Sequence, residues 1–99
     1  MKLEDKVAIV TAAGRGIGRG IAEALAAEGA RVVVNSYSPE TTEATAEAVR
    51  ARGAQAAALP GDITDPNKML ELRELALREF GQIDILVNNV GAGPKTAPQ

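Results

Sequence analysis

The chain has 99 residues, 45% of them apolar, and a formal net charge of −2, which fits one small globular domain of the cytoplasm and leaves no room for a second. The absence of cysteine and histidine excludes disulfides, thiolate metal sites and the commonest general base, and we expect no metal ion. The slightly acidic charge, the scarcity of aromatic residues and the lack of a long apolar run or secretory leader give no basis for binding nucleic acid or membrane.

The chain begins with a short apolar run and then a glycine-rich segment. Residues 7–11, Val-Ala-Ile-Val-Thr, are typical of a buried strand. Four glycines follow at alternate positions within residues 14–20. Beyond them Ile17, Ile21 and Leu25 recur every fourth residue, which predicts a helix with these three side chains on one stripe.

A second strand and a second helix follow in the same rhythm. Gly29 stands where the first helix is expected to end. Residues 31–35 contain three consecutive valines and predict a second buried strand. Ser38 and Pro39 then form an N-cap followed by proline at the first helical position, and Gly53 is expected to stop this second helix.

The last third of the chain repeats the pattern. Residues 55–59 predict a weaker third strand because their alanines favour a helix and only their place between two helices suggests otherwise. Asp65 and Pro66 repeat the cap and proline, and Gly81 is expected to close a third helix. Residues 83–87 predict a fourth strand. The apolar face of the third helix is marked by Met69, Leu72, Ala76 and Phe80.

The resulting order, βαβαβαβ, predicts an α/β fold with a parallel sheet and helices on its faces. We expect a Rossmann-like, doubly wound sheet with strand order 3-2-1-4 and right-handed crossovers. Residues 91–99, with one glycine and two prolines after Gly91, are expected to form a loop tail.

A glycine-rich turn between a strand and a helix is suited to bind an anion, because the start of the helix offers unpaired N–H groups and the positive end of its dipole. The spacing G-x-G-x-x-G does not fit, since it requires glycine at Arg19 or Ile21. No Lys-Ser/Thr pair follows, so the turn is not a Walker A loop. The alternative is a tight turn that binds nothing.

Three segments together resemble the short-chain dehydrogenase/reductase family. Residues 11–18, Thr-Ala-Ala-Gly-Arg-Gly-Ile-Gly, resemble its T-G-x-x-x-G-x-G element. Residues 61–63, Gly-Asp-Ile, are similar to its adenine-contacting aspartate segment, and residues 84–91 resemble its fourth strand ending in N-N-A-G. Two positions depart from the family pattern: Ala12 replaces the usual first glycine and Val90 the usual alanine, which bears on cofactor affinity more than on fold.

The resemblance implies a dinucleotide cofactor at the carboxyl ends of the strands. Asp84 is instead expected to tie loops together at the other end of the sheet. The residues expected to contact the cofactor are Thr11, Gly14, Arg15, Gly16, Ile17, Gly18, Asn35, Ser36, Asp62, Ile63, Asn89 and Gly91.

The second strand is expected to end beside the cofactor's ribose. An acidic residue there binds the 2′-hydroxyl of NAD(H), but Asn35 is neutral and neither Ser36 nor Tyr37 is acidic. Arg15 lies in the glycine turn, and in the resembling family a basic residue before the middle glycine marks NADP(H) enzymes. We therefore expect NADP(H) rather than NAD(H), while Arg15 as a solvated turn residue and Asn35 as a strand cap remain the alternative.

The family's catalytic Tyr-x-x-x-Lys has no counterpart here. The single tyrosine, Tyr37, is followed four residues later by Thr41. We therefore expect residues 1–99 to be the cofactor-binding half-domain of a short-chain oxidoreductase for alcohols or ketones, inactive alone. A catalytically silent binding module and a truncated fragment are the alternatives. The apolar strand 83–87 at the sheet edge suggests a missing C-terminal half or a homo-oligomer.

Overall fold

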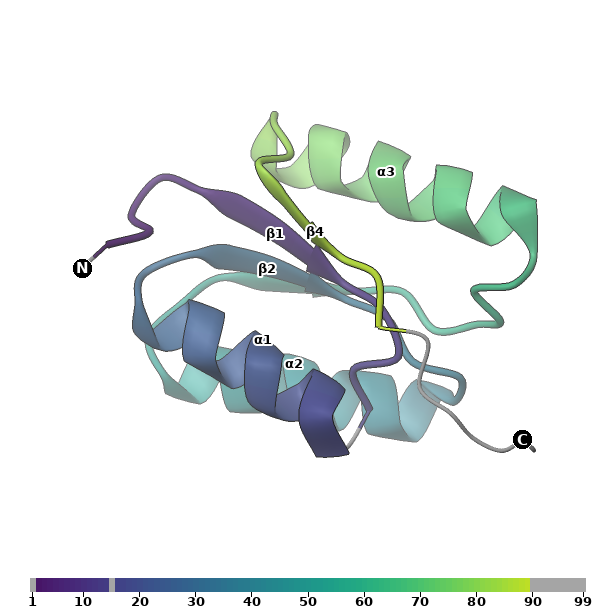
Figure 1. The fold of residues 1–99 in the computed structure, drawn as a ribbon, viewed down its shortest axis with the longest axis horizontal. Helices are drawn as coiled ribbons and strands as arrows, with labels where there is room; N and C mark the ends of the chain where they lie inside the picture. The colour runs from purple at the N-terminus through teal and green to yellow at the C-terminus, as the bar shows by residue number, and fades with distance from the viewer. Residues whose placement is uncertain (1, 15, 90–99) are drawn as a thin grey trace.

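The computed structural model describes residues 2–14 and 16–89, which alternate between strands and helices (Figure 1). Within these ranges, no helix is long and apolar enough to cross a membrane. The elements in chain order are β1 (Val7–Val10), α1 (Gly16–Ala27), β2 (Arg31–Val34), α2 (Pro39–Ala51), β3 (Ala56–Ala58), α3 (Pro66–Phe80) and β4 (Ile85–Val87).

The strands form one parallel sheet in the order β3-β2-β1-β4, which confirms the predicted topology. Residues 7–10 of β1 pair with residues 31–34 of β2 on one side, and residues 8–10 pair with residues 85–87 of β4 on the other. The central strands β1 and β2 are almost entirely buried. All four carboxyl ends therefore lie along one edge of the sheet, where a doubly wound fold carries its ligand site.

The two faces of the sheet hold separate apolar clusters. Alternate strand residues such as Val10 and Val34 point to the face covered by α1 and α2, whereas Ile9 and Val33 point to the face covered by α3 (Figure 1). Alternation of this kind follows from the period of two along a strand. The sheet is thus covered on both faces, as expected for parallel strands rich in valine.

Helix ends follow the local signals of the sequence. Ser38 caps α2 by accepting a hydrogen bond from the Thr41 N–H, and Asp65 caps α3 by accepting one from the Asn67 N–H. Gly81 ends α3 in the left-handed conformation, with φ of 80°. All three agree with the sequence prediction, because each depends on a few neighbouring residues rather than on the tertiary fold.

The predicted stripe of α1 is wrong at its first member. Ile17 is 77% exposed, and Ile21 and Leu25 are only partly buried. The fully covered face is instead formed by the small residues Gly18, Ala22 and Ala26, which also repeat every fourth residue. Small side chains let α1 approach the sheet closely, and the larger residues then pack beside this face rather than under it.

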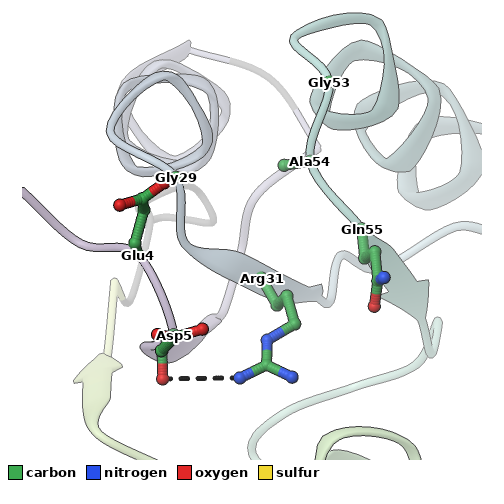
Figure 2. A pocket seen from close by; sticks show the side chains of 7 residues that line it. All are labelled: Glu4, Asp5, Gly29, Arg31, Gly53, Ala54 and Gln55. Atoms are coloured by element: carbon green, nitrogen blue, oxygen red, sulfur yellow. Dashed lines mark hydrogen bonds between the residues drawn. The ribbon is translucent and has the colours of Figure 1, made fainter. Parts of the chain in front are cut away.

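The amino ends of the strands border an open hollow of about 420 Å³ (Figure 2). Arg31 crosses it, and its Nη2 donates to the backbone oxygen of Asp5 at 3.4 Å. Near this end, Asp84 Oδ2 accepts from the Val7 N–H at 2.9 Å, which confirms its expected loop-tying role. The hydrogen bond from the Val7 N–H, and to a smaller extent the one from the Gln82 side chain, holds the pKa of Asp84 below its usual value. The hollow is lined by Glu4, Asp5, Gly29, Arg31, Gly53, Ala54 and Gln55.

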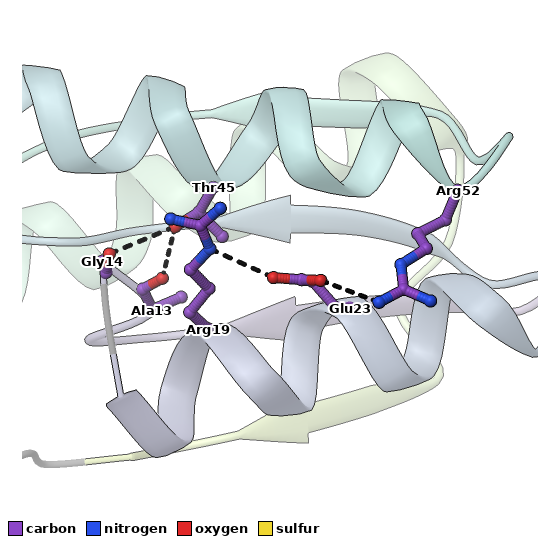
Figure 3. Close-up of polar contacts among 6 residues, drawn as sticks. All are labelled: Ala13, Gly14, Arg19, Glu23, Thr45 and Arg52. Carbon is purple, nitrogen blue, oxygen red and sulfur yellow. Dashed lines mark hydrogen bonds and ion pairs between the residues drawn. The ribbon is translucent and has the colours of Figure 1, made fainter.

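Helices α1 and α2 are joined by a chain of charges on the outside of the molecule (Figure 3). Glu23 of α1 pairs with Arg19 at 3.1 Å and with Arg52, just after α2, at 3.0 Å. Hydrogen bonds from Arg52 and Arg19 hold the pKa of Glu23 below its usual value. Because its side chains are partly exposed, this network contributes little to stability.

One edge of the described sheet is apolar and partly open. In β4, Leu86 is 53% exposed, and it is in register with Ile9, so it lies on the face that α3 covers. On α3 itself, Leu70 and Leu77 are 51% and 50% exposed. An uncovered apolar strand edge is a surface that favours pairing with another chain.

We expect the 99-residue chain to self-associate through this edge. Replacing Leu86 with lysine places a charge on the edge strand, which disfavours strand pairing. Size-exclusion chromatography with light scattering should show wild-type protein larger than a monomer at micromolar concentration, and L86K shifted toward the monomer. The matched control A24K adds the same charge at an exposed position of α1 and should behave as wild type. A monomeric wild type, or L86K that associates as before, would contradict this expectation.

Candidate functional site

The candidate site lies where β1 ends and α1 begins. After β1 the chain builds β2 and β3 on one side, and it returns through α3 to place β4 on the other side. In open α/β sheets this reversal of direction leaves a crevice at the carboxyl ends of the central strands. Residues 11–14 and the first turn of α1 border that crevice, with residues 88–89 beside them.

The backbone of the turn after β1 is held by groups from β2 and α2. The Ala12 N–H donates to Asn35 Oδ1 at 3.4 Å, and the Ala13 N–H donates to the Asn35 backbone oxygen at 2.7 Å. The Ala13 oxygen accepts from the Thr45 hydroxyl at 2.7 Å (Figure 3). Buried backbone groups need such partners, so the conformation of this turn is determined by the protein itself.

The glycines of the turn fall into two kinds. A Cβ on Gly14 would lie 2.8 Å from Thr41 Oγ1, and a Cβ on Gly18 would collide with the Ala12 backbone oxygen and lie 2.7 Å from Asn89 Nδ2, so packing requires glycine at both positions. Gly16 has φ of 63°, and a Cβ there would have no neighbour within 4 Å. Gly16 therefore leaves bare backbone facing open space at the start of α1, which fits the close approach of a pyrophosphate.

Ala12 occupies the position where the resembling family has glycine, and its backbone is left-handed, with φ of 51°. A non-glycine residue in this region is strained by contact of its Cβ with the backbone. Alanine in place of the family's glycine therefore strains the backbone at this position. The other departure, Val90, lies outside the described residues.

Asn35 is buried at the end of β2, where its side chain binds backbone groups of two neighbouring segments. It is only 1% exposed, and its Nδ2 donates to the Leu59 oxygen at 3.0 Å and to the Gly61 oxygen at 3.1 Å. Its Oδ1 faces the Ala12 N–H. The side chain thus ties the glycine turn to the segment after β3. An aspartate here would oppose two carbonyl oxygens.

Thr11 also supports the site from within. It is completely buried, and its hydroxyl lies 3.3 Å from Asn88 Oδ1 and 3.4 Å from the Asn89 backbone oxygen. Asn89 in turn donates from Nδ2 to the Ala12 oxygen at 3.4 Å. These contacts join the ends of β1 and β4. Thr11 is left with no exposed surface for a ligand.

Ser36 belongs to a hydroxyl cluster at the start of α2. It is 4% exposed, and its Oγ lies 2.7 Å from Thr41 Oγ1 and 2.5 Å from Thr42 Oγ1. Thr42 also donates to the Ser38 oxygen at 2.7 Å. The cluster fixes the segment between β2 and α2, and the side chain that emerges from it is Tyr37, at 80% exposure.

Asp62 and Ile63 follow β3 at the same edge of the sheet. Asp62 Oδ1 accepts from the Thr64 N–H at 2.9 Å and from the Thr64 hydroxyl at 2.7 Å, a turn of the kind expected for this segment. Ile63 packs against the cluster beneath α3. The structure thus brings residues 61–63 to the edge that holds the glycine turn, joined to it through Asn35.

The remaining predicted site residues divide by position. Ile17 is exposed in the first turn of α1, beside Gly16. Arg15 and Gly91 lie outside the described residues. Among the residues that are described, no group of three or more acidic side chains is placed to hold a metal ion.

Sequence reasoning missed the threonines of α2. Thr42 and Thr45 are both fully buried, and Thr45 bonds directly to the glycine turn. The available signal was the spacing of Thr42, Thr45 and Val49, which repeats at helical positions i, i+3 and i+7 on one face. A polar residue on the buried face of a helix needs a partner, and here the nearest acceptor was in another element.

Comparison with known proteins identifies the family. The short chain dehydrogenase family model matches residues 6–99, so the chain belongs to this family, whose members use NAD(P)(H). Versicolorin reductase 1 of Aspergillus parasiticus is 45% identical over 91 residues, which are 91% of this chain and 35% of that protein. The 3-oxoacyl-acyl-carrier-protein reductase of Escherichia coli is 44% identical over 91 residues, 92% of this chain and 36% of that protein.

Solved structures agree with the sequence relatives. A hydroxysteroid dehydrogenase from Escherichia coli superposes with a TM-score of 0.89 at 39% identity, covering 94% of this chain and 40% of that one. A short-chain dehydrogenase/reductase variant from Serratia marcescens gives a TM-score of 0.87 at 38% identity, covering 94% of this chain and 38% of that one. The chain spans about a third of the length of the curated relatives it matches.

The strain at Ala12 predicts that glycine there stabilises the fold. The left-handed region costs an alanine ~1–2 kcal/mol, while glycine loses ~0.5–1 kcal/mol through its freer unfolded chain. We expect A12G to raise the free energy of unfolding by up to ~1 kcal/mol in urea denaturation. The control A13G changes a buried neighbour without positive φ and should lower the same quantity. A12G that is less stable than wild type would contradict the strain argument.

Proposed function

We propose that the chain is the NADP(H)-preferring, dinucleotide-binding part of a short-chain oxidoreductase that acts on an alcohol or a ketone. The observation that carries this proposal is the open backbone at Gly16, which is left-handed at the start of α1. It lies at the carboxyl end of β1, where the strand order changes from one side of β1 to the other. Family membership supports the cofactor class, and the open backbone at Gly16 supports pyrophosphate binding.

The electrostatics of α1 support an anionic ligand. Its first turn contains no acidic residue, so no carboxylate compensates the positive end of the helix dipole. The segment from Thr11 to Gly14 is equally free of acidic side chains. Gly16, Ile17 and Gly18 would hold the pyrophosphate through their backbone, and the bound dinucleotide would supply the hydride acceptor or donor.

NADP(H) preference is supported by the residues between β2 and α2. No carboxylate occurs from Asn35 to Pro39, so nothing there repels a 2′-phosphate. Since Asn35 and Ser36 are buried, we assign the contact with the 2′ position to Tyr37 and Ser38, at the exposed end of β2. The first carboxylate after this segment is Glu40, in the first turn of α2.

The chemical step needs a proton donor or acceptor at the substrate oxygen. These 99 residues contain no Tyr-x-x-x-Lys, and we propose that they bind cofactor without turning over substrate. The names of two relatives denote reductases, which supports a ketone as the oxidised substrate. A catalytically silent module would bind the same cofactor, and a self-associating fragment is favoured by the open apolar edge at Leu86.

The cofactor site is tested by adding a side chain at Gly16. Asparagine tolerates left-handed backbone better than most residues, and the space around Gly16 is open, so G16N should fold. Its side chain would occupy the place of the pyrophosphate, and we expect the Kd for NADPH to rise at least about tenfold, a loss of ~1.4 kcal/mol. Fluorescence titration of NADPH measures this effect.

The matched control is G20N, one turn further along α1, where a side chain also meets open space. Its NADPH affinity should stay within about twofold of wild type, and circular dichroism should match for all three proteins. Equal NADPH affinity of G16N and wild type would refute the proposed pyrophosphate site at Gly16. A wild-type chain that does not bind either dinucleotide would refute the proposed function as a whole.

Cofactor choice is tested at Tyr37 with a pair of variants that differ only in charge. Y37D places a carboxylate near the expected 2′-phosphate, whereas Y37N has nearly the same shape without charge. Two like charges ~4 Å apart repel by ~1 kcal/mol in water and by more near a protein surface. We expect the ratio of NADPH to NADH affinity to fall about tenfold in Y37D and to stay near wild type in Y37N. An unchanged ratio would place the 2′ position elsewhere.

A further inference from the structure

Thr45 has a buried hydroxyl that bonds to the turn after β1, although the residue belongs to α2. It lies on the inner face of α2 with no exposed surface, and its Oγ1 donates to the Ala13 oxygen at 2.7 Å. A second, longer contact of 3.4 Å reaches the Gly14 oxygen (Figure 3). Threonine in a helix commonly bonds back to its own helical turn, but here the described partners of the hydroxyl are two backbone oxygens 31 and 32 residues earlier in the chain.

The Ala13 residue is thereby held on both sides. Its N–H donates to the end of β2 at Asn35, and its oxygen accepts from α2 at Thr45. Ala13 is completely buried, so neither group has water as an alternative partner. Gly14 follows, packed so closely on Ser36 and Thr41 that a Cβ would not fit.

We propose that Thr45 is a positioning residue for dinucleotide binding: from α2 it fixes the orientation of the turn that leads to the open backbone at Gly16. This inference rests on the proposed function. The hydroxyl does not touch the ligand. It determines the path of the chain at residues 13 and 14, and a small rotation of these peptides moves the start of α1 relative to the carboxyl ends of β1 and β4.

The position of the Thr45 hydroxyl explains why the conformation of the turn depends on α2 as well as on the glycines of the motif. A turn built from glycine and alanine has few side chains of its own, so its conformation depends on close packing at Gly14 and on hydrogen bonds to its backbone. The Ala12 and Ala13 N–H groups donate to Asn35 at the end of β2, the Ala12 oxygen accepts from Asn89, and the Ala13 oxygen accepts from Thr45. The cofactor affinity of this chain is therefore linked to α2, a helix that lies behind the turn.

The experiment compares two ligands on the 99-residue chain. NADPH contains the pyrophosphate, whereas adenosine 2′-monophosphate carries the 2′-phosphate and adenine but no pyrophosphate. The variant T45V keeps the branched shape and removes the hydroxyl, leaving the buried Ala13 oxygen without its donor. We expect its Kd for NADPH to rise about tenfold and its Kd for adenosine 2′-monophosphate to stay within twofold of wild type.

Conservative variants separate positioning from stability. T45S keeps the hydroxyl and loses a methyl group, so it should restore NADPH affinity even if it is less stable than wild type. V49A removes two methyl groups from the buried face of the same helix without touching the turn, and its NADPH affinity should be unchanged. If T45V does not fold by circular dichroism, T45C, with a weakly donating thiol of similar volume, takes its place.

Each outcome decides the inference. Loss of NADPH affinity in T45V or T45C, with rescue in T45S and retained binding of the monophosphate, supports it. Equal loss for both ligands, or the same loss in V49A, makes Thr45 a general stability residue and overturns it. Wild-type binding of NADPH with unchanged affinity in T45V overturns it while the proposed function stands. Failure of the wild type to bind NADPH overturns the proposed function and this inference with it.

Discussion

The fold depends on one constraint: the turn that follows the buried strand β1 has few side chains, so other elements must supply hydrogen-bond partners for its backbone. Peptide groups of Ala12 and Ala13 are removed from water, and each must find a partner within the protein. Asn35 supplies two of these partners from the end of β2, and Thr45 supplies another from α2. The turn is consequently formed before any ligand arrives, because the elements that satisfy it are parts of the core.

This constraint changes how the glycine motif is interpreted. A glycine beside a candidate phosphate site is readily assigned to the ligand, yet packing against Thr41 requires glycine at position 14, and packing against the Ala12 backbone and Asn89 requires it at position 18. Among Gly14, Gly16 and Gly18, Gly16 alone combines a left-handed backbone with open space on the side where a Cβ would lie. Two glycines of the motif therefore let the turn and α1 pack closely, and the third leaves its backbone open, at the place where we propose that the pyrophosphate binds.

The same distinction separates what the sequence predicts from what it does not. Strand order and helix caps are predictable because they follow from topology rules and from contacts a few residues long, as at Ser38 and Asp65. The roles of Asn35 and Ile17 depend on tertiary neighbours. Asn35 turns inward toward the oxygens of Leu59 and Gly61, and Ile17 lies outside the stripe because small residues occupy the buried face of α1. A periodic pattern locates a face, but close packing decides which residues line it.

The two ends of the sheet differ in charge, and this difference is itself an argument for the ligand. Around the amino ends, carboxylates and guanidinium groups such as Asp84 and Arg31 bind backbone groups of the loops. At the carboxyl ends the same role is filled by neutral side chains, Thr11, Asn35 and Asn89 among them. Of the described residues that directly follow a strand, in the ranges 11–14, 35–38, 59–62 and 88–89, Asp62 is the single carboxylate. Because amides and hydroxyls satisfy buried backbone without adding negative charge, they leave the positive end of α1 uncompensated, and an anionic cofactor is the ligand that such a surface favours.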